Sequence, residues 1–246
     1  MSIAAKVEEC IPYLRRYARA ATGSTVSGDT CVELALQSIL EGALGPELNV
    51  GDPSRAELYK LVDIHLDHVS YSGDSRARRA ILLVAMEGLS NEEASGVLGV
   101  DTGQLNALIE TAQESFRKRT ADAVLIIEDE AMISAQLKRM AERAGHRVVG
   151  IATRASDAVR MGRDLHPDLI LCDIHLGDGS MGTDAIAELD LPDHVPVVYI
   201  TAYPEKYLSN ANQGPSYLVT KPFHPEYVQA IIGHALLNDA VDSARW

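Results

Sequence analysis

The sequence predicts two domains of different class, an all-α domain over residues 1–120 and an α/β domain with a five-stranded parallel sheet over residues 121–246. Three observations lead to this prediction. A chain of 246 residues fits two domains of ordinary size. From residue 122 onward, short apolar β-branched runs alternate with amphipathic stretches, which is typical of an α/β domain. Before residue 120, the apolar residues recur at helical spacing and form no convincing strand.

The first helical region covers about residues 1–44, with a break expected at residues 22–28. Its apolar positions at helical spacing are Ile11, Leu14, Ala18, Cys31, Leu34, Ala35 and Leu36. A second break is expected at residues 45–53, and a connecting segment with a further helix follows. The apolar residues of that helix are Leu58, Leu61, Val62 and Leu66, and a loop at residues 71–75 ends the segment.

The second helical region, residues 75–119, has the pattern of a helix-turn-helix. Ser90 with Glu93 forms one capping box, and Asp101 with Gln104 forms a similar pair at the start of the next helix. Gly99 suits the turn between them. The basic run at residues 117–119 complements the negative pole of the last helix, and residues 120–122 serve as the linker.

The second domain shows five nearly continuous apolar runs, as expected for strands covered by helices on both faces. The expected strands are residues 123–127, 146–151, 169–172, 195–200 and 217–220, and the expected helices are 132–144, 156–165, 183–189, 205–212 and 225–237, followed by a polar tail from Asp239.

Acidic and other polar residues follow these strands where each one ends. Glu128, Asp129 and Glu130 follow the first strand, Asp173 the third, Thr201 the fourth and Lys221 the fifth. The carboxyl ends of parallel strands meet at one edge of the sheet, so we expect these side chains to converge. Viewed singly, each has an ordinary alternative, because such acids and threonines often cap helices and a Lys before Pro is usually solvated. The pattern on successive strand ends favours a functional site.

These residue types match one reaction, the attack of a carboxylate on phosphorus beside a divalent cation. We predict Asp173 as the nucleophile and a metal ligand, Asp129 as the direct ligand of Mg²⁺, and Glu128 as a ligand through water. Lys221 supplies positive charge to the phosphoryl oxygens, and the Thr201 hydroxyl donates to one of them.

The segments VLIIEDE, LILCDIHLGDG, VVYITAYP and LVTKPF resemble the four motifs of bacterial two-component receiver domains. The resemblance implies a flavodoxin-like (βα)5 fold and phosphoryl transfer from a sensor histidine kinase to Asp173. It also implies Mg²⁺ held by Glu128, Asp129, Asp173 and the backbone carbonyl of His175, and a cis Lys221–Pro222 bond. One position departs from the pattern, because receivers usually have an aromatic residue where this chain has Leu218, and the nearby aromatics are Tyr199, Tyr203 and Tyr217.

With IPYLRRYARAATGS and LLVAMEGLSNEEASGVLGV, the helical half resembles the two helical regions of extracytoplasmic-function sigma factors. A sigma-like half followed by a receiver resembles the PhyR family of general stress response regulators. This resemblance implies that, once Asp173 is phosphorylated, the sigma-like half captures a small anti-sigma factor of the NepR type.

Charge argues against direct DNA binding. The net charge is −13, and residues 1–120 carry 12 Lys and Arg against 17 Asp and Glu. No Lys or Arg occurs from Asp101 to Phe116, the helix that would read bases. The alternative is a response regulator that binds DNA directly, supported by Arg76, Arg78, Arg79 and residues 117–119.

A phosphatase with an aspartate nucleophile is a more remote alternative. One large superfamily of such enzymes has a second Asp two residues after the nucleophile, and His175 occupies that position here. The N-terminus lacks the apolar core of a signal peptide, so we expect a cytoplasmic protein that is not an enzyme in the ordinary sense.

Overall fold

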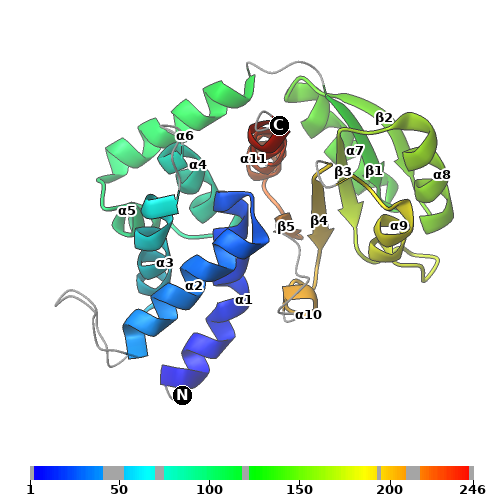
Figure 1. The fold of residues 1–246 in the computed structure, drawn as a ribbon. Coiled ribbons are helices and arrows are strands. Elements are labelled where there is room, and N and C mark those ends of the chain that lie inside the picture. The colour runs from blue at the N-terminus through cyan, green and yellow to red at the C-terminus, as the bar shows by residue number, and fades with distance from the viewer. Residues whose placement is uncertain are drawn as a thin grey trace. The chain divides into compact units, whose positions relative to one another are not determined.

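A computed structural model of the chain describes residues 3–40, 53–69, 75–117, 122–192, 195–208 and 217–243. By its internal contacts the chain divides into a helical unit, residues 1–112 with 205–216, and an α/β unit, residues 113–204 with 217–246. Helices account for the first unit, and a five-stranded parallel sheet with its helices accounts for the second (Figure 1). The predicted fold class is confirmed.

The helical unit begins with three helices, of which the second and third start at a local capping signal. These are α1 (Ile3–Thr22), α2 (Thr25–Leu40) and α3 (Arg55–Val69). Ser24 accepts a hydrogen bond from the Ser27 amide at the start of α2. Ser54 and Glu57 form a reciprocal pair at the start of α3, with the Ser54 amide donating to the Glu57 carboxylate at 2.6 Å. Helices α2 and α3 therefore start where a side chain satisfies their free amides.

The helices break within the expected residues 22–28, since α1 ends at Thr22, but the break is shorter than expected, because α2 already begins at Thr25 and contains Gly28. Gly28 is buried, and a Cβ at this position would lie 2.5 Å from the Arg19 nitrogen and 2.7 Å from the Arg19 Cα. Gly28 therefore allows close approach of the α1 and α2 backbones instead of ending a helix.

The second helical region contains α4 (Ser75–Ile81), the π-helix η1 (Leu82–Met86), α5 (Asn91–Leu98) and α6 (Thr102–Arg117). Both predicted caps are confirmed. Ser90 and Glu93 form a complete capping box. Asp101 accepts from the Gln104 amide at 2.8 Å, while the Asp101 amide donates to the Gln104 side chain at 3.1 Å. Gly99 ends α5 in the left-handed conformation, as a turn between two such helices requires.

The α/β unit contains five parallel strands in the spatial order β2-β1-β3-β4-β5. They are β1 (Ala123–Ile127), β2 (Arg147–Ala152), β3 (Leu169–Asp173), β4 (Val197–Thr201) and β5 (Tyr217–Thr220). Each lies within two residues of its expected position at either end. The order places β1 and β3 side by side in the middle, with Ile127 paired to Cys172, so that the residues that follow them emerge together.

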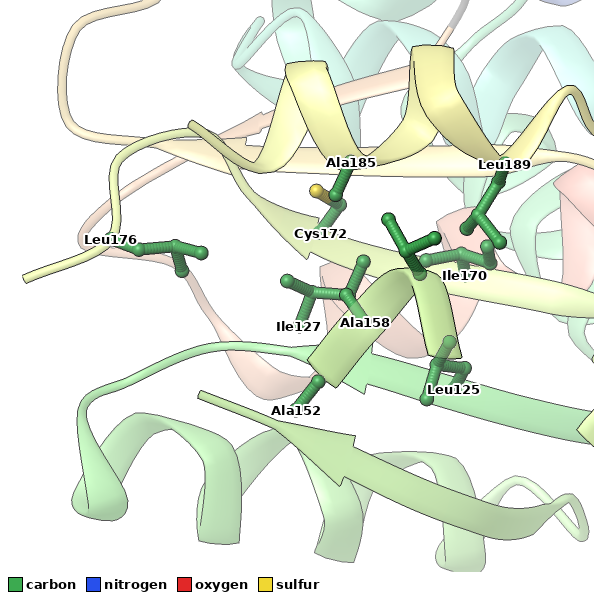
Figure 2. Packing of buried hydrophobic residues seen from close by; sticks show 10 residues of the cluster. Leu125, Ile127, Ala152, Ala158, Ile170, Cys172, Leu176, Ala185 and Leu189 are labelled. Carbon is green, nitrogen blue, oxygen red and sulfur yellow. The ribbon is translucent and has the colours of Figure 1, made fainter. Parts of the chain in front are cut away.

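Two layers of helices cover the sheet (Figure 1). The helices of the α/β unit are α7 (Ala131–Arg143), α8 (Ala155–Leu165), α9 (Gly182–Leu189) and α11 (Pro225–Ser243), whereas α10 (Glu205–Leu208) falls in the helical unit. Helices α8 and α9 pack together, and α7 packs against α11. Figure 2 shows the apolar side chains of β1, β3, α8 and α9 that interdigitate on one face, among them Leu125, Ile170 and Leu189.

The last two helices differ from the expected ranges or lie partly outside the described residues. Helix α11 continues to Ser243, so the predicted end at residue 237 with a polar tail from Asp239 is wrong. Of the helix expected at 205–212, the structure describes α10 as far as Leu208, and the remainder lies outside the described residues. Within the described part of the chain, no helix has the length and apolar character needed to cross a membrane.

The close packing at Gly28 yields a stability prediction. We expect Gly28→Ala to lower the free energy of unfolding by about 1–3 kcal/mol, because the new methyl group would overlap backbone atoms of α1. Gly96→Ala in α5 is the matched control, since nothing lies within 4 Å of its Cβ position. That control should be neutral or gain up to about 1 kcal/mol from helix propensity. Urea unfolding measures both, and equal effects of the two substitutions would contradict this account of Gly28.

Candidate functional site

Three carboxylates meet at the carboxyl edge of the sheet. Glu128 follows β1 directly, Asp129 comes next, and Asp173 is the last residue of β3. Their ligand oxygens all lie within 4.8 Å of one another. Glu128 and Asp173 are buried, with 0% and 5% of their surface exposed, and Asp129 is half-buried. Hard oxygen donors at this spacing suit a small divalent cation such as Mg²⁺.

Lys221 reaches the same cluster from the end of β5. Its amide donates to the Thr201 carbonyl at 2.8 Å, which extends the pairing of β5 with β4 beyond Thr220. Its ammonium lies 2.6 Å from the Asp173 carboxylate and 2.9 Å from that of Glu128. Burial opposes the charge on Lys221, but the hydrogen bonds to Asp173 and Glu128 outweigh it and raise the pKa of the ammonium. The peptide bond to Pro222 is cis, as the resemblance implied.

Negative charge at Glu128 is costly even with Lys221 beside it. Burial raises the pKa of Glu128 to about 7, and the nearby Asp173 adds to the effect against the hydrogen bond from Lys221. Two backbone amides offset part of this cost, since the Glu130 amide donates to Glu128 at 3.2 Å and the His175 amide donates to Asp173 at 3.1 Å. The edge thus concentrates more negative charge than a single ammonium compensates.

Thr201 ends β4 beside the cluster and is fully buried. Its hydroxyl accepts a hydrogen bond from the Tyr203 amide at 3.1 Å. The structure separates the three aromatic residues noted in the sequence. Tyr199 packs among the apolar residues under α8 and α9, and Tyr217 is buried with its hydroxyl 3.3 Å from His234 of α11. Tyr203 is 51% exposed, and its ring meets that of His175 edge-on.

Two glycines shape the site, and the sequence pattern did not single out either of them. A Cβ on Gly177 would lie 2.5 Å from an Asp129 carboxylate oxygen. A Cβ on Gly182 would lie 2.0 Å from the Asp173 carbonyl oxygen and 2.6 Å from the Cys172 sulfur. Their presence in LILCDIHLGDG and at the start of the next helix was the available signal, but glycine is also common in loops where nothing approaches it closely.

A doubly wound parallel sheet with this acidic edge, a threonine and a lysine at successive strand ends defines a receiver domain. The family model described as the response regulator receiver domain matches residues 124–233. Two further models match the helical half, the Sigma2 domain of PhyR at residues 7–63 and the sigma-like domain of the response regulator PhyR at residues 74–119. The chain belongs to the PhyR family of response regulators.

Relatives agree over nearly the whole chain. The phyllosphere-induced regulator PhyR of Methylorubrum extorquens is 38% identical, over 96% of this chain and 95% of the relative. The crystal structure of PhyR from Brucella abortus is 37% identical with a TM-score of 0.86, over 99% and 98% of the two chains. That of the anti-anti-sigma factor PhyR from Bartonella quintana is also 37% identical with a TM-score of 0.86, over 99% of both chains. A co-crystal structure of the Bartonella quintana protein with the anti-sigma factor NepR is 37% identical over 96% of this chain and 99% of that chain, with a TM-score of 0.44.

The room that Gly177 leaves for Asp129 can be tested by a single methyl group. We expect Gly177→Ala to displace the Asp129 carboxylate and to weaken Mg²⁺ binding about 10- to 100-fold while the domain stays folded. Gly182→Ala should instead lower stability, because its methyl group would meet backbone. Calorimetric titration with Mg²⁺ and thermal unfolding separate the two effects. An unchanged Mg²⁺ affinity in Gly177→Ala would contradict this role.

Proposed function

We propose that this protein is a phosphorylation-activated anti-anti-sigma factor, in which phosphorylation of Asp173 releases the sigma-like half to sequester a NepR-type anti-sigma factor. The observation that carries the proposal is the convergence of Glu128, Asp129, Asp173 and Lys221 at one sheet edge, in a chain whose helical half matches the sigma-like regions of PhyR. The phosphodonor would be a sensor histidine kinase. The protein itself turns over no separate substrate.

The phosphoryl transfer follows from the groups at the site. A carboxylate oxygen of Asp173 forms a bond to phosphorus while the bond between phosphorus and the donor breaks, and the donor leaves with the electron pair. Glu128, Asp129, Asp173 and the His175 carbonyl would hold Mg²⁺, whose charge would neutralise oxygens of the transferring group. The Lys221 ammonium, 2.6 Å from Asp173, is placed to pair with a phosphoryl oxygen on that carboxylate. The Thr201 hydroxyl would donate to another.

The surface of the helical unit favours a protein partner over DNA. Asp101, which precedes helix α6, and Glu110 and Glu114 within it are exposed and would repel phosphate groups. Two of the arginines that supported the DNA-binding alternative have internal partners. Arg76 donates to the Leu98 carbonyl, and Arg79 is buried with Asp63 and Asp67. A sigma-like module without a basic reading face needs another output, and the relative from Bartonella quintana is described as an anti-anti-sigma factor.

Phosphorylation and partner capture should be coupled. The phosphoryl group adds on the order of one to two negative charges at Asp173 and would draw Thr201 and Lys221 toward it. A swing from about 1% to about 99% of the active form needs about 5.5 kcal/mol of differential stabilisation. A local rearrangement supplies only part of such a difference, so partner binding should contribute the rest, and each event should strengthen the other.

The phosphoacceptor assignment predicts a labelling pattern. Acetyl phosphate or a cognate kinase should label the protein only with Mg²⁺ or Mn²⁺ present, and Asp173→Asn should abolish labelling because the nucleophilic oxygen is lost. Asp178→Asn, an exposed change in the same loop, should still be labelled. Gel analysis with a phosphate-binding dye or mass spectrometry measures this. Labelling of Asp173→Asn, or labelling in excess chelator, would rule out the assignment.

The release mechanism predicts an order of affinities for a NepR-type anti-sigma factor. Phosphorylated full-length protein and isolated residues 1–120 should both bind more tightly than the unphosphorylated full-length protein, because the receiver no longer masks the sigma-like half. Calorimetry or biolayer interferometry on the three forms gives the order. If residues 1–120 bind no better than the unphosphorylated protein, the receiver does not mask the partner site.

A further inference from the structure

A buried charged network centred on Glu87 lies in the helical unit, where the proposed chemistry makes no use of it. Glu87 is 3% exposed and directly follows η1. Its carboxylate accepts two hydrogen bonds from Arg16 of α1, at 2.9 and 2.7 Å, and a third from the Tyr59 hydroxyl of α3. Arg55, also of α3, donates to the Glu87 carbonyl at 2.9 Å. Two helices, α1 and α3, thus converge on the residue that follows η1.

The π-helix places Glu87 at this junction. In η1 the Glu87 amide donates to the Leu82 carbonyl at 3.0 Å, and the Leu89 amide reaches back to Leu83 at 3.0 Å. Between them, Gly88 has a left-handed φ of 66°. A π-turn disrupts the regular α-helical hydrogen bonding and is frequent at functional sites. Here the backbone departs from the α-helix where Glu87 and the Met86 carbonyl both contact Arg16.

A second buried cluster lies beside the first. Arg79 of α4 donates to the Asp63 carbonyl and contacts the Asp63 carboxylate, both at 3.1 Å. The Tyr17 hydroxyl donates to the other Asp63 oxygen at 2.5 Å. The rings of Tyr17 and Tyr59 meet edge-on with centroids 5.5 Å apart, which joins this cluster to the Glu87 network. Burial raises the pKa of both tyrosines well above the usual value, so their hydroxyls stay protonated and act as donors.

Both clusters link the two sigma-like regions. Arg16, Arg55, Tyr59 and Asp63 fall in the segment matched by the Sigma2 model, residues 7–63, whereas Arg79 and Glu87 fall in the second matched segment, residues 74–119. A buried ion pair is costly to break, because separating the regions would leave charged groups without partners at the junction. The clusters therefore favour one relative placement of the two regions over all others.

We propose that Glu87 is a positioning residue that holds the two sigma-like regions as one preformed body, so that an anti-sigma factor meets a finished surface instead of ordering two independent modules. This proposal rests on the proposed function for its partner, but the rigidity that it asserts belongs to the free protein. A ligand whose binding-competent form is only partly populated binds more weakly by that fraction. Loss of the Glu87 network should therefore weaken binding of the anti-sigma factor without any change in the surface that contacts it.

Distance measurements between spin labels in the full-length protein test directly whether the Glu87 network fixes the two regions relative to each other. Labels at Glu33→Cys in α2 and Glu92→Cys in α5, both exposed positions, report one on each region. Cys10 is replaced by Ser, while Cys31 and Cys172 are buried and protected. We expect one narrow distance distribution that is the same with and without acetyl phosphate and Mg²⁺. Glu87→Gln should broaden it, and Tyr59→Phe, which removes a single hydrogen bond to Glu87, should broaden it less.

The combined variant Arg16→Met, Tyr59→Phe, Glu87→Leu separates positioning from charge as such. Apolar groups of similar size often replace a buried ion pair without loss, so this variant should recover the narrow distribution. Binding of the NepR-type anti-sigma factor encoded in the same genome should fall about tenfold in Glu87→Gln, if about nine in ten molecules leave the competent arrangement, and should recover in the combined variant. Phosphorylation of Asp173 should be equal in all of them.

Three outcomes would overturn the proposal: a broad distribution in the unmodified protein, a Glu87→Gln distribution as narrow as that of the unmodified protein, or full partner affinity in a Glu87→Gln protein whose distribution is broad. Should Glu87→Gln fail to fold, the same comparison rests on Tyr59→Phe. Failure of the proposed function would look different, because the distance distributions would behave as expected while phosphorylation left partner affinity unchanged.

Discussion

The acidic edge of the sheet depends on one electrostatic constraint, the need to keep Glu128, Asp129 and Asp173 within a few ångströms of one another in a largely buried place. The parallel sheet forces this proximity, because β1 and β3 are neighbours and end at the same edge. Lys221, which follows β5, compensates part of this negative charge, and backbone amides compensate a further part. The remaining excess of negative charge would attract a divalent cation to this edge.

The helical unit handles charge in the opposite way. Arg16 and Arg79 are buried and bind Glu87 and Asp63, and the more exposed Arg55 donates to the Glu87 carbonyl, while α6 exposes Glu110 and Glu114. A module that reads DNA needs its cationic side chains on the surface. A sigma-like module that binds a protein instead can bury its arginines in ion pairs inside the fold. The residue type that would have supplied affinity for a promoter thus pairs with acidic groups inside the unit.

The sequence predicted the strands, the convergence of polar side chains at their ends and the helix caps, because each depends on a local signal. Buried strands read as apolar runs, and Ser90 with Glu93 or Asp101 with Gln104 lie three residues apart. The sequence did not predict that Gly28 lies inside a helix, because glycine in a polar stretch indicates a turn unless the neighbouring helix is known. It was silent on Glu87, whose partner Arg16 lies 71 residues away and whose π-helix has no sequence signature. Pairs of this kind become visible only when the packing of distant helices is in hand.

The contact at Gly182 has a consequence for design. With the Asp173 carbonyl only 2.0 Å from the position of a Cβ, the first turn of α9 sits directly on the end of β3, and no side chain fits between them. Anyone who grafts this aspartate onto another α/β scaffold must therefore transfer the glycine with it, nine residues downstream, and keep the length of the loop that connects them. The end of β3, the connecting loop and the first turn of α9 with Gly182 must be transferred together. The aspartate alone would lack the backbone that orients its carboxylate.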